Sequence, residues 1–344
     1  MNYLYDMVLV TGATGLVGSH LVLHLLENNE SVRAIYRIHS SIEKTKSLFT
    51  LYGKEQLFEK IEWVAADITE VPSMAKAFAG IDHVYHCAAM ISFDPSDEKQ
   101  LRKINIEGTA NVVNFCLDFH IKKLCYVSSI AALGDLKEHE TIITEETEWN
   151  PELAHSDYAI SKYGAEMEIW RGQQEGLQVM VINPGIIIGP VATSDDWKNG
   201  SASIFPRVAK GLRFYTKGST GFISVHDVVK MLRQLMKSDR SGERFIAIAE
   251  NMIFEKMLGI VAEALNVSPP KIPAKHWMTS IGWRSDWIIS GLLNRPRKLT
   301  QLMARSLHQT SYFSNDNATM KLDFKFGDIT TALRETAKKY LQVR

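Results

Sequence analysis

Three glycines near the amino terminus constrain this chain more than any other feature of its sequence. Gly12, Gly15 and Gly18 follow the apolar run Met7–Val10 and open a segment, 16–26, in which apolar residues recur at helical spacing. This order predicts a strand, a tight turn and the start of a helix. The three glycines would then allow, in turn, the tight turn, the approach of a phosphate to the backbone, and close contact between helix and strand. We expect the turn to hold a pyrophosphate at the amino terminus of the helix.

The segments that follow alternate between predicted strands and predicted helices. Further strands are expected at 31–36, 61–66, 82–86, 123–128 and 179–182, and helices near 40–51, 70–79, 97–119 and 156–175. Such alternation implies right-handed crossovers and one parallel sheet. The expected fold class is α/β, a doubly wound (Rossmann) sheet that binds ligands at the carboxyl ends of its strands.

The alternation ends near residue 183, where prolines and glycines begin to punctuate shorter elements. We expect a dinucleotide-binding domain over 1–183, to which 220–248 partly returns, and a smaller, mostly helical C-terminal substrate lobe over 184–219 and 249–344. Within that lobe, 276–293 is amphipathic and rich in tryptophan. Its polar face lacks the lysine and arginine excess of helices that lie on membranes. We therefore expect it to cover an apolar substrate pocket or to pack on the sheet.

Charge and cysteine content restrict the partners and the compartment. Lysines and arginines number 39, and aspartates and glutamates also number 39, so no global field favours nucleic acid or an anionic membrane. Cys87, Cys116 and Cys125 share no metal-ligand spacing, and no metal is expected. No secretory leader or run of about 18 apolar residues is found. We expect a cytoplasmic protein with a small-molecule substrate and no membrane span.

The residues after the second and third expected strands bear on the identity of the cofactor. An acid after the second strand would bind the 2′-hydroxyl of an adenosine ribose, whereas an arginine would accept a 2′-phosphate. Here Arg37 follows the strand and Lys44 lies in the next segment. This favours NADP(H), with NAD(H) possible, unless Arg37 is only a solvated surface charge. Asp67 is placed to bind the adenine amino group, with Ile68 in apolar contact, or else to cap a helix beginning near Thr69.

Further cofactor contacts are expected from the glycine-rich turn and from the segments after the fourth and sixth strands. The small side chains after the fourth strand would let the cofactor backbone pass closely. These positions are Thr14, Leu16, Val17, Ala88, Ala89, Met90, Pro184 and Ile187.

Tyr158 and Lys162 lie four residues apart on an expected helix and so share one face. A free tyrosine has a pKa of about 10, but a nearby lysine ammonium, reinforced by an oxidised nicotinamide, favours the phenolate. Tyr158 can then protonate a carbonyl oxygen as hydride arrives, or accept the proton from an alcohol in reverse. Ser128-Ser129, at the end of the fifth strand, would bind the same oxygen. Asn105 can orient the lysine through backbone or water. Tyr158 and Lys162 are also expected to contact the cofactor.

The order of these motifs resembles that of the extended short-chain dehydrogenases/reductases over nearly the whole chain. The matching motifs are Thr11-Gly-x-x-Gly-x-x-Gly18, Asp67, Asn105, Tyr126-Val-Ser-Ser129, Tyr158-x-x-x-Lys162, Asn183-Pro-Gly185 and Val225-His-Asp227. The resemblance implies a catalytic set of Ser129, Tyr158 and Lys162 with Asn105 in support. Arg37 with Lys44 is similar to the dihydroflavonol-4-reductase and 3β-hydroxysteroid dehydrogenase-like branch, where such a pair binds the 2′-phosphate. Homodimers are common in the family, so a homodimer is an expectation here.

Two departures separate this chain from other activities of that family. Sugar-nucleotide dehydratases carry Thr-Asp-Glu where this chain has Ser129-Ile-Ala131, so the acids for eliminating water are missing. Sugar-nucleotide epimerases commonly place an arginine where Gly221 precedes Phe222, although Arg207 or Arg213 could substitute. The expected function is NADP(H)-dependent reduction of an apolar ketone or aldehyde, or oxidation of a secondary alcohol. A nucleotide-sugar epimerase and a non-catalytic dinucleotide-sensing protein are the alternatives.

Overall fold

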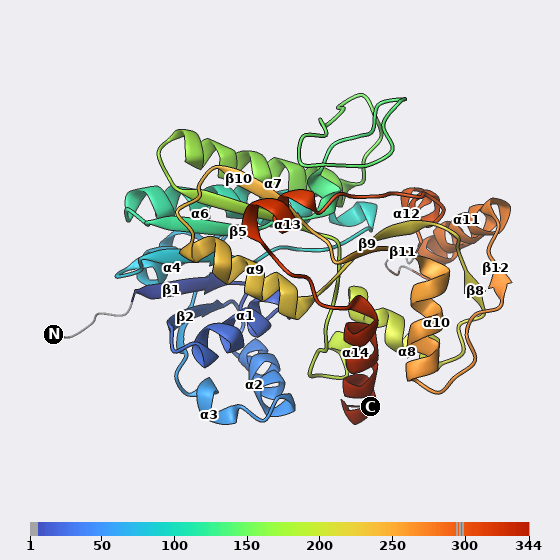
Figure 1. Ribbon diagram of the computed structural model, residues 1–344, viewed down its shortest axis with the longest axis horizontal. Helices are drawn as coiled ribbons and strands as arrows, with labels where there is room; N and C mark the ends of the chain where they lie inside the picture. Colours follow the sequence, from blue (N-terminus) through green and yellow to red (C-terminus); the bar gives the residue numbers. More distant parts are fainter. Residues whose placement is uncertain (1–5, 294, 296, 298, 344) are drawn as a thin grey trace.

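A seven-stranded parallel sheet forms the centre of the molecule in the computed structural model, which describes residues 6–293, 295, 297 and 299–343 (Figure 1). The strand order is β10-β6-β5-β4-β1-β2-β3. The strands are β1 (Met7–Thr11), β2 (Ser31–Tyr36), β3 (Glu62–Ala65), β4 (His83–His86), β5 (Lys123–Val127), β6 (Val179–Pro184) and β10 (Glu243–Ala247). The chain builds outward from β1 and then reverses to β4, which confirms the predicted doubly wound α/β fold.

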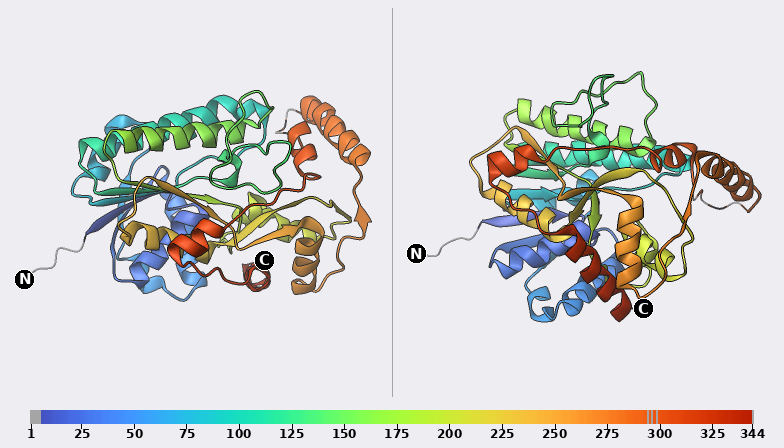
Figure 2. Two further views of the ribbon diagram at one scale, coloured as in Figure 1. Left: turned by 45° about the horizontal axis from the view of Figure 1, so that its top comes forward. Right: turned by 45° about the vertical axis from the view of Figure 1, so that its right-hand side comes forward.

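Helices cover both faces of this sheet, and each face has its own apolar core. One face carries α1 (Leu16–Glu27), α9 (Val225–Lys237) and α13 (Asp316–Leu322), with α2 (Ile42–Leu51) and α3 (Glu55–Phe58) beside them. The other carries α4 (Val71–Phe78), α6 (Gly108–Asp118) and α7 (Asp157–Gln174) (Figure 2). Because both faces are covered, every residue of β5 and β6 is buried.

The single helix expected over 97–119 is interrupted in its middle. It consists of α5 (Glu98–Leu101), the π-helical segment η3 (Arg102–Glu107) and α6. The buried Asn105 lies in the π-helical segment. At the junction, a Cβ on Gly108 would lie 2.7 Å from a methyl of Ile68, so the helix approaches the sheet as closely as glycine allows. Local periodicity does not predict such a segment, which is often found at functional sites.

The second half of the chain forms a third apolar core next to the large sheet. The strands β7 (Ile186–Ile188), β9 (Ser219–Ser224) and β11 (Glu250–Ile253) make a three-stranded sheet, and β8 (Phe214–Tyr215) pairs with β12 (Ile272–Pro273). The helices here are α8 (Ile204–Ala209), α10 (Phe254–Ala264), α11 (His276–Leu293), α12 (Gln301–Ser306) and α14 (Ile329–Val343). Residues 225–247 return to the large sheet as α9 and β10.

The tryptophan-rich helix α11 lies at one end of the molecule (Figure 2). Ser290 is the only buried residue among its eighteen, and Trp277, Ile281 and Leu292 are 61%, 56% and 79% exposed. The expectation that this segment packs on the sheet is therefore wrong, because the helix contacts α12 instead. These three side chains face solvent, and the expected role of the helix over a substrate pocket stays a prediction. Among the helices of the described residues, none is long and apolar enough to cross a membrane.

Candidate active site

The turn between β1 and α1 brings its backbone against the segment that follows β4. Gly12 has a φ of +68°, and a Cβ built there would lie 2.6 Å from the backbone nitrogen of Ala88. A Cβ on Gly18 would overlap the carbonyl oxygen of Gly12. At Gly15, by contrast, a Cβ would meet only that same oxygen, at 3.4 Å. The packing of the turn therefore requires glycine at Gly12 and Gly18, whereas the space beside Gly15 is open.

The amino terminus of α1 is suited to an anion. Within the described chain, no side chain caps this helix and its first turn contains no acid, so its N–H groups and the positive end of its dipole are available. Nearby cofactor positions remain accessible: Gly15 and Ala89 are exposed, while Thr14, Leu16, Val17, Met90 and Ile187 are half-buried. Pro184 is buried at the end of β6. This cradle fits the pyrophosphate of a dinucleotide.

Arg37 and Lys44 are held differently. Arg37 is exposed directly after β2. Lys44, in α2, forms a 2.5 Å ion pair with Asp196 of η5 (Asp196–Lys198). The adjacent Thr45 donates a 3.0 Å hydrogen bond to the Ala13 carbonyl, which joins α2 to the glycine-rich turn. A 2′-phosphate bound at Arg37 would therefore compete with Asp196 for Lys44, which the sequence did not indicate.

Asp67 and Ile68 follow β3 in a local turn. The Asp67 carboxylate accepts hydrogen bonds from the backbone nitrogen and the hydroxyl of Thr69, both at 2.8 Å. Because α4 begins only at Val71, the alternative that Asp67 caps a helix at Thr69 is wrong. The Ile68 side chain is buried against Gly108. The role of Asp67 and Ile68 at an adenine ring stays a prediction.

Asn105 joins the segment after β4 to α7. Its Oδ1 accepts from the Met90 nitrogen at 2.7 Å, and its Nδ2 donates to the Met90 carbonyl at 3.0 Å and to the Ser161 hydroxyl at 2.8 Å. Ser161 directly precedes Lys162. Asn105 therefore positions the lysine's own helix, and none of these three bonds reaches the Lys162 ammonium itself.

Tyr158 lies in the first turn of α7, which Ser156 caps by accepting a 3.1 Å hydrogen bond from the Ala159 nitrogen. Its ring packs on Phe93 with the centroids 5.6 Å apart. Burial raises the pKa of Tyr158, and the nearby Ser129 side chain only partly opposes this. The expected lowering of this pKa is therefore not a property of the chain by itself.

Lys162 is almost fully buried one turn further along α7. Its Nζ donates to the Tyr126 hydroxyl at 2.6 Å and to the Val127 carbonyl at 2.9 Å. Burial lowers the pKa of Lys162 to about 7, against the opposing charge of Glu166. A lysine ammonium has three donors, and the third has no partner among the described residues. Such an unsatisfied buried donor fits a hydroxyl-bearing ligand such as a ribose.

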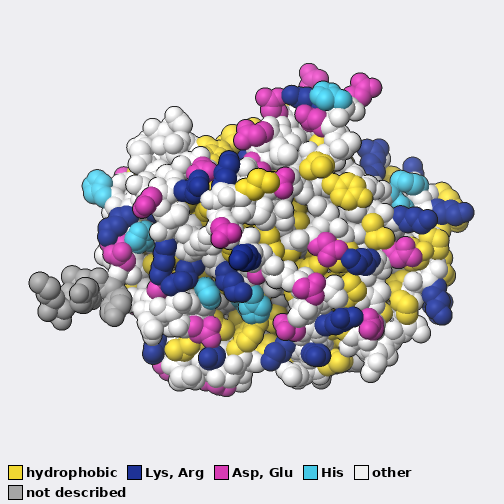
Figure 3. All heavy atoms as spheres, in the orientation of Figure 1, with side chains coloured by type: hydrophobic (Ala, Val, Ile, Leu, Met, Phe, Trp, Pro, Cys, Tyr) yellow, Lys and Arg dark blue, Asp and Glu magenta, His cyan; other side chains and the backbone are white. Residues whose placement is uncertain are grey.

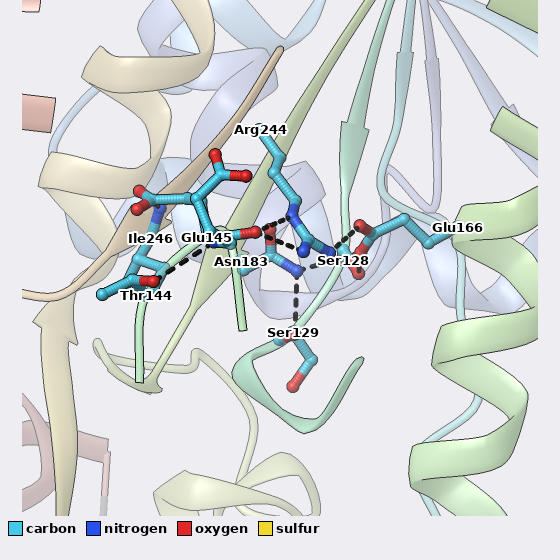
Figure 4. A network of polar contacts seen from close by, with 9 residues as sticks. Ser128, Ser129, Thr144, Glu145, Glu166, Asn183, Arg244 and Ile246 are labelled. Carbon is cyan, nitrogen blue, oxygen red and sulfur yellow. Dashed lines mark hydrogen bonds and ion pairs between the residues drawn. The ribbon is translucent and has the colours of Figure 1, made fainter. Parts of the chain in front are cut away.

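The two serines after β5 have different surroundings. Ser128 donates a 2.6 Å hydrogen bond to the buried carboxylate of Glu166, which also accepts a 2.9 Å bond from Asn183 (Figure 4). The side chain of Asn183 in turn donates to the Ser129 carbonyl at 3.0 Å. The Ser128 hydroxyl is thus turned toward this network, whereas the Ser129 hydroxyl accepts a 3.1 Å hydrogen bond from the Ala131 nitrogen and lies near Tyr158. This arrangement favours Ser129 over Ser128 as the group that binds a substrate oxygen.

Arg244 closes the same network from the edge strand β10. Its Nη1 lies 3.1 Å from the Glu166 carboxylate, and its Nε donates to the Glu145 carbonyl at 2.9 Å (Figure 4). The Glu145 carboxylate accepts a 2.8 Å bond from the Ile246 nitrogen. One buried carboxylate, Glu166, therefore fixes the carboxyl ends of β5 and β6 relative to the helix that carries Tyr158 and Lys162.

Sequence reasoning missed several residues of this site. Glu166 lies four positions after Lys162, so helical spacing alone could have placed it on the same face. Tyr126 stands out in the sequence only as part of a motif, and its hydroxyl is the nearest acceptor for Lys162. Phe93 lies in an irregular segment with no periodic signal, and only the fold brings it to Tyr158.

Comparison with known proteins identifies the family. The profile described as the NAD dependent epimerase/dehydratase family matches residues 8–249. The chain belongs to this family. It is an NAD(P)-dependent oxidoreductase of the extended short-chain dehydrogenase/reductase type, as the sequence motifs predicted.

Similar proteins include reductases and epimerases. A Synechocystis sp. protein with the provisional name dihydroflavonol 4-reductase is 26% identical over 337 residues, 96% of this chain and 93% of that one. Cinnamoyl-CoA reductase 1 of Petunia hybrida is 27% identical over 78% of this chain and 79% of its own. The solved structure of UDP-glucose 4-epimerase from Thermotoga maritima is 19% identical with a TM-score of 0.75, covering 98% of this chain and 99% of that one, and shares the fold.

Proposed function

We propose that this protein reduces a ketone or aldehyde with NADP(H), or oxidises the corresponding secondary alcohol in reverse. The observation that carries the proposal is the placement of Tyr158 near the Ser129 side chain, one helical turn before the buried Lys162. Two hydroxyl groups placed near each other can both hydrogen-bond one carbonyl oxygen. The reductase names of the similar proteins support the same reaction type.

The proton chemistry follows from the pKa of Tyr158. When bound, the nicotinamide supplies or removes the hydride. Because burial keeps Tyr158 protonated at neutral pH, its phenol donates a proton to the carbonyl oxygen as the carbonyl carbon is reduced. The products are an alcohol and a phenolate, and Lys162 stabilises the phenolate with its charge. Ser129 holds the oxygen, and Tyr158 regains its proton from solvent.

The side chains beside Tyr158 favour an apolar substrate. Phe93 packs on the tyrosine ring and is 43% exposed, and Ile91, two residues earlier, is 61% exposed. These side chains offer an apolar surface at the reacting group. We propose an apolar carbonyl compound as the substrate class.

The cofactor preference rests on Arg37. We propose NADP(H) because Arg37 is exposed after β2 without a competing acid in β2, so its guanidinium can bind a 2′-phosphate in two-point fashion. Arg37→Glu should lower the NADPH-to-NADH ratio of kcat/KM by about tenfold or more. Arg102→Glu, a charge reversal on α5–η3, is the control and should leave that ratio unchanged. An unchanged ratio in Arg37→Glu would refute the role of Arg37.

The packing of Gly221 favours a reductase over an epimerase of nucleotide sugars. A Cβ at Gly221 would overlap the Ile248 side chain, so the space an arginine would need there is filled. Arg207 and Arg213, which the sequence offers as possible substitutes for that arginine, are both exposed.

The test is NADPH oxidation by the purified protein across a panel of apolar ketones and aldehydes, with UDP-glucose epimerisation measured in parallel. Carbonyl-dependent oxidation without epimerisation supports the proposal. Epimerisation with a tightly co-purifying NAD would instead establish an epimerase. Absence of both activities, with NADPH still bound, would indicate a sensing protein without turnover.

A further inference from the structure

Helix α11 presents an apolar stripe to solvent. Trp277, Ile281, Ile288 and Leu292 recur at spacings of four, seven and four residues, which places them on one helical face. They are 61%, 56%, 54% and 79% exposed. A continuous exposed apolar stripe of this kind marks a surface that binds another molecule or a membrane.

The segment around this helix is strongly basic, although the whole chain is balanced. Residues 271–308 contain seven lysines and arginines and a single acid, Asp286. The Asp286 carboxylate already pairs with Arg295 at 3.1 Å and accepts a 3.0 Å bond from the Leu299 nitrogen. Lys271, Lys275 and Arg305 are exposed, and within the described chain they form no ion pair. The segment therefore has an excess of six positive charges over its own acid, with Asp94 beside Arg297 as a neighbouring carboxylate.

The β8–β12 ribbon extends the same surface. Phe214 and Ile272 are direct partners across the ribbon, and each is 44% exposed. In Figure 3, dark-blue and yellow side chains lie together at the end of the molecule where Figure 1 places α11, α12 and β12. We call the exposed side of α11 and this ribbon, with the flanking cations, the docking face.

We propose that the docking face binds the surface of a bilayer that contains anionic phospholipids. Tryptophan, isoleucine and leucine insert at the boundary between headgroups and acyl chains, and lysine and arginine beside them bind anionic headgroups. A two-fold contact with a second copy would instead bring the same cations against one another. The charge therefore favours lipid over self-association.

The docking face connects directly to the candidate active site. The Arg297 nitrogen, just after α11, donates a 2.7 Å hydrogen bond to the Asp94 carboxylate. Asp94 follows Phe93, whose ring packs on Tyr158. The segment that carries Phe93 is thus tied to the surface that would meet the lipid. The docking itself does not depend on the proposed reductase activity.

The test is co-sedimentation of the full chain with vesicles. The protein should pellet with vesicles made of equal parts phosphatidylcholine and phosphatidylglycerol, and should stay in solution with phosphatidylcholine alone or in high salt. Ile281→Asp with Ile288→Asp should weaken partitioning by about tenfold or more. Met320→Asp on α13, where the side chain is 79% exposed, is the matched control and should bind as the wild type does.

A second pair of variants tests the charge. The double variant Lys271→Glu with Lys275→Glu should also fail to co-sediment with the anionic vesicles. The control double variant Lys60→Glu with Lys76→Glu should bind them as the wild type does. Unchanged thermal unfolding would show that all variants fold. The proposal is overturned if the wild type does not pellet with the anionic vesicles, or if the Ile281/Ile288 variant pellets equally well. If the wild type does not bind vesicles but forms a dimer, and the Ile281/Ile288 variant is a monomer, the docking face would instead be assigned to contact with a second copy.

Discussion

Glu166 is a charged residue with 1% of its side chain exposed, and its carboxylate is shared by Ser128, Asn183 and Arg244. Removing one partner of such a buried group leaves the others without their acceptor, which costs more than a surface ion pair does. Its negative charge also raises the pKa of Lys162. We regard Glu166 as a positioning residue that acts through Lys162 and Ser129.

Glu166→Gln should therefore change both stability and the pH profile. We expect a loss of about 2 kcal/mol in the free energy of unfolding, because Gln keeps one acceptor but loses the charge that Arg244 pairs with. The pKa of Lys162 should fall below its present value of about 7, which would shift the corresponding limb of the kcat pH profile to lower pH. Glu168→Gln on the same helix is the control. An unshifted profile in Glu166→Gln would contradict the coupling.

Sequence reasoning identified the candidate catalytic residues but not the residues that hold them in place. The strand–turn–helix order and the Tyr-x-x-x-Lys spacing are local patterns, so Gly12, Tyr158 and Lys162 could be identified directly. Glu166 and Arg244 are 78 residues apart, and only the pairing of β10 with β6 brings them together. Burial raises the pKa of Tyr158 in the chain by itself, an effect of tertiary packing that no local pattern contains, and its lowering by a bound nicotinamide stays a prediction.

The element that we propose holds the cofactor is the turn between β1 and α1. Gly12→Ala should abolish NADPH binding and destabilise the protein, because its Cβ would lie 2.6 Å from the Ala88 nitrogen in addition to the cost of the left-handed conformation. Gly53→Ala is a matched control, since Gly53 has a φ of +66° with nothing within 4 Å of its Cβ position. It should lose only about 1 kcal/mol of stability and keep NADPH binding. NADPH affinity is measured by isothermal titration and the free energy of unfolding by urea denaturation. If the two variants changed both quantities equally, this account of the turn would be contradicted.

Two elements departed from prediction for reasons of tertiary structure. The π-helical segment η3 forms where Asn105 bonds the Met90 backbone and Gly108 meets Ile68, contacts that periodicity cannot reveal. The amphipathic pattern of α11 predicted a helix that covers a substrate pocket or packs on the sheet, but the structure leaves most of its residues unburied. The lysines and arginines that support the lipid-binding proposal mostly flank this helix, so inspection of 276–293 alone did not find them.

The whole molecule should lose stability in mild acid. Burial lowers the pKa of His20 and of His86 to about 3. His86 is held between Thr11 at 2.7 Å and Thr109 at 2.9 Å. Below the unfolded value of about 6.5 the unfolded chain binds protons that these folded histidines do not. Each of these two histidines should therefore lower the free energy of unfolding by about 1 kcal/mol when the pH falls from 7.5 to 5.5. Urea unfolding at the two values measures this, and equal stability at both would contradict the buried neutral histidines.

The segment after β4 lies against both the glycine-rich turn, at Ala88, and Tyr158, at Phe93. Hydride transfer assisted by Tyr158 is the central claim, and the rate of Tyr158→Phe tests it most directly. Compared with the control Tyr163→Phe on the same helix, this variant should bind NADPH normally and lose about 10²- to 10⁴-fold in kcat for carbonyl reduction. A kcat equal to that of the control, with NADPH still bound, would contradict it.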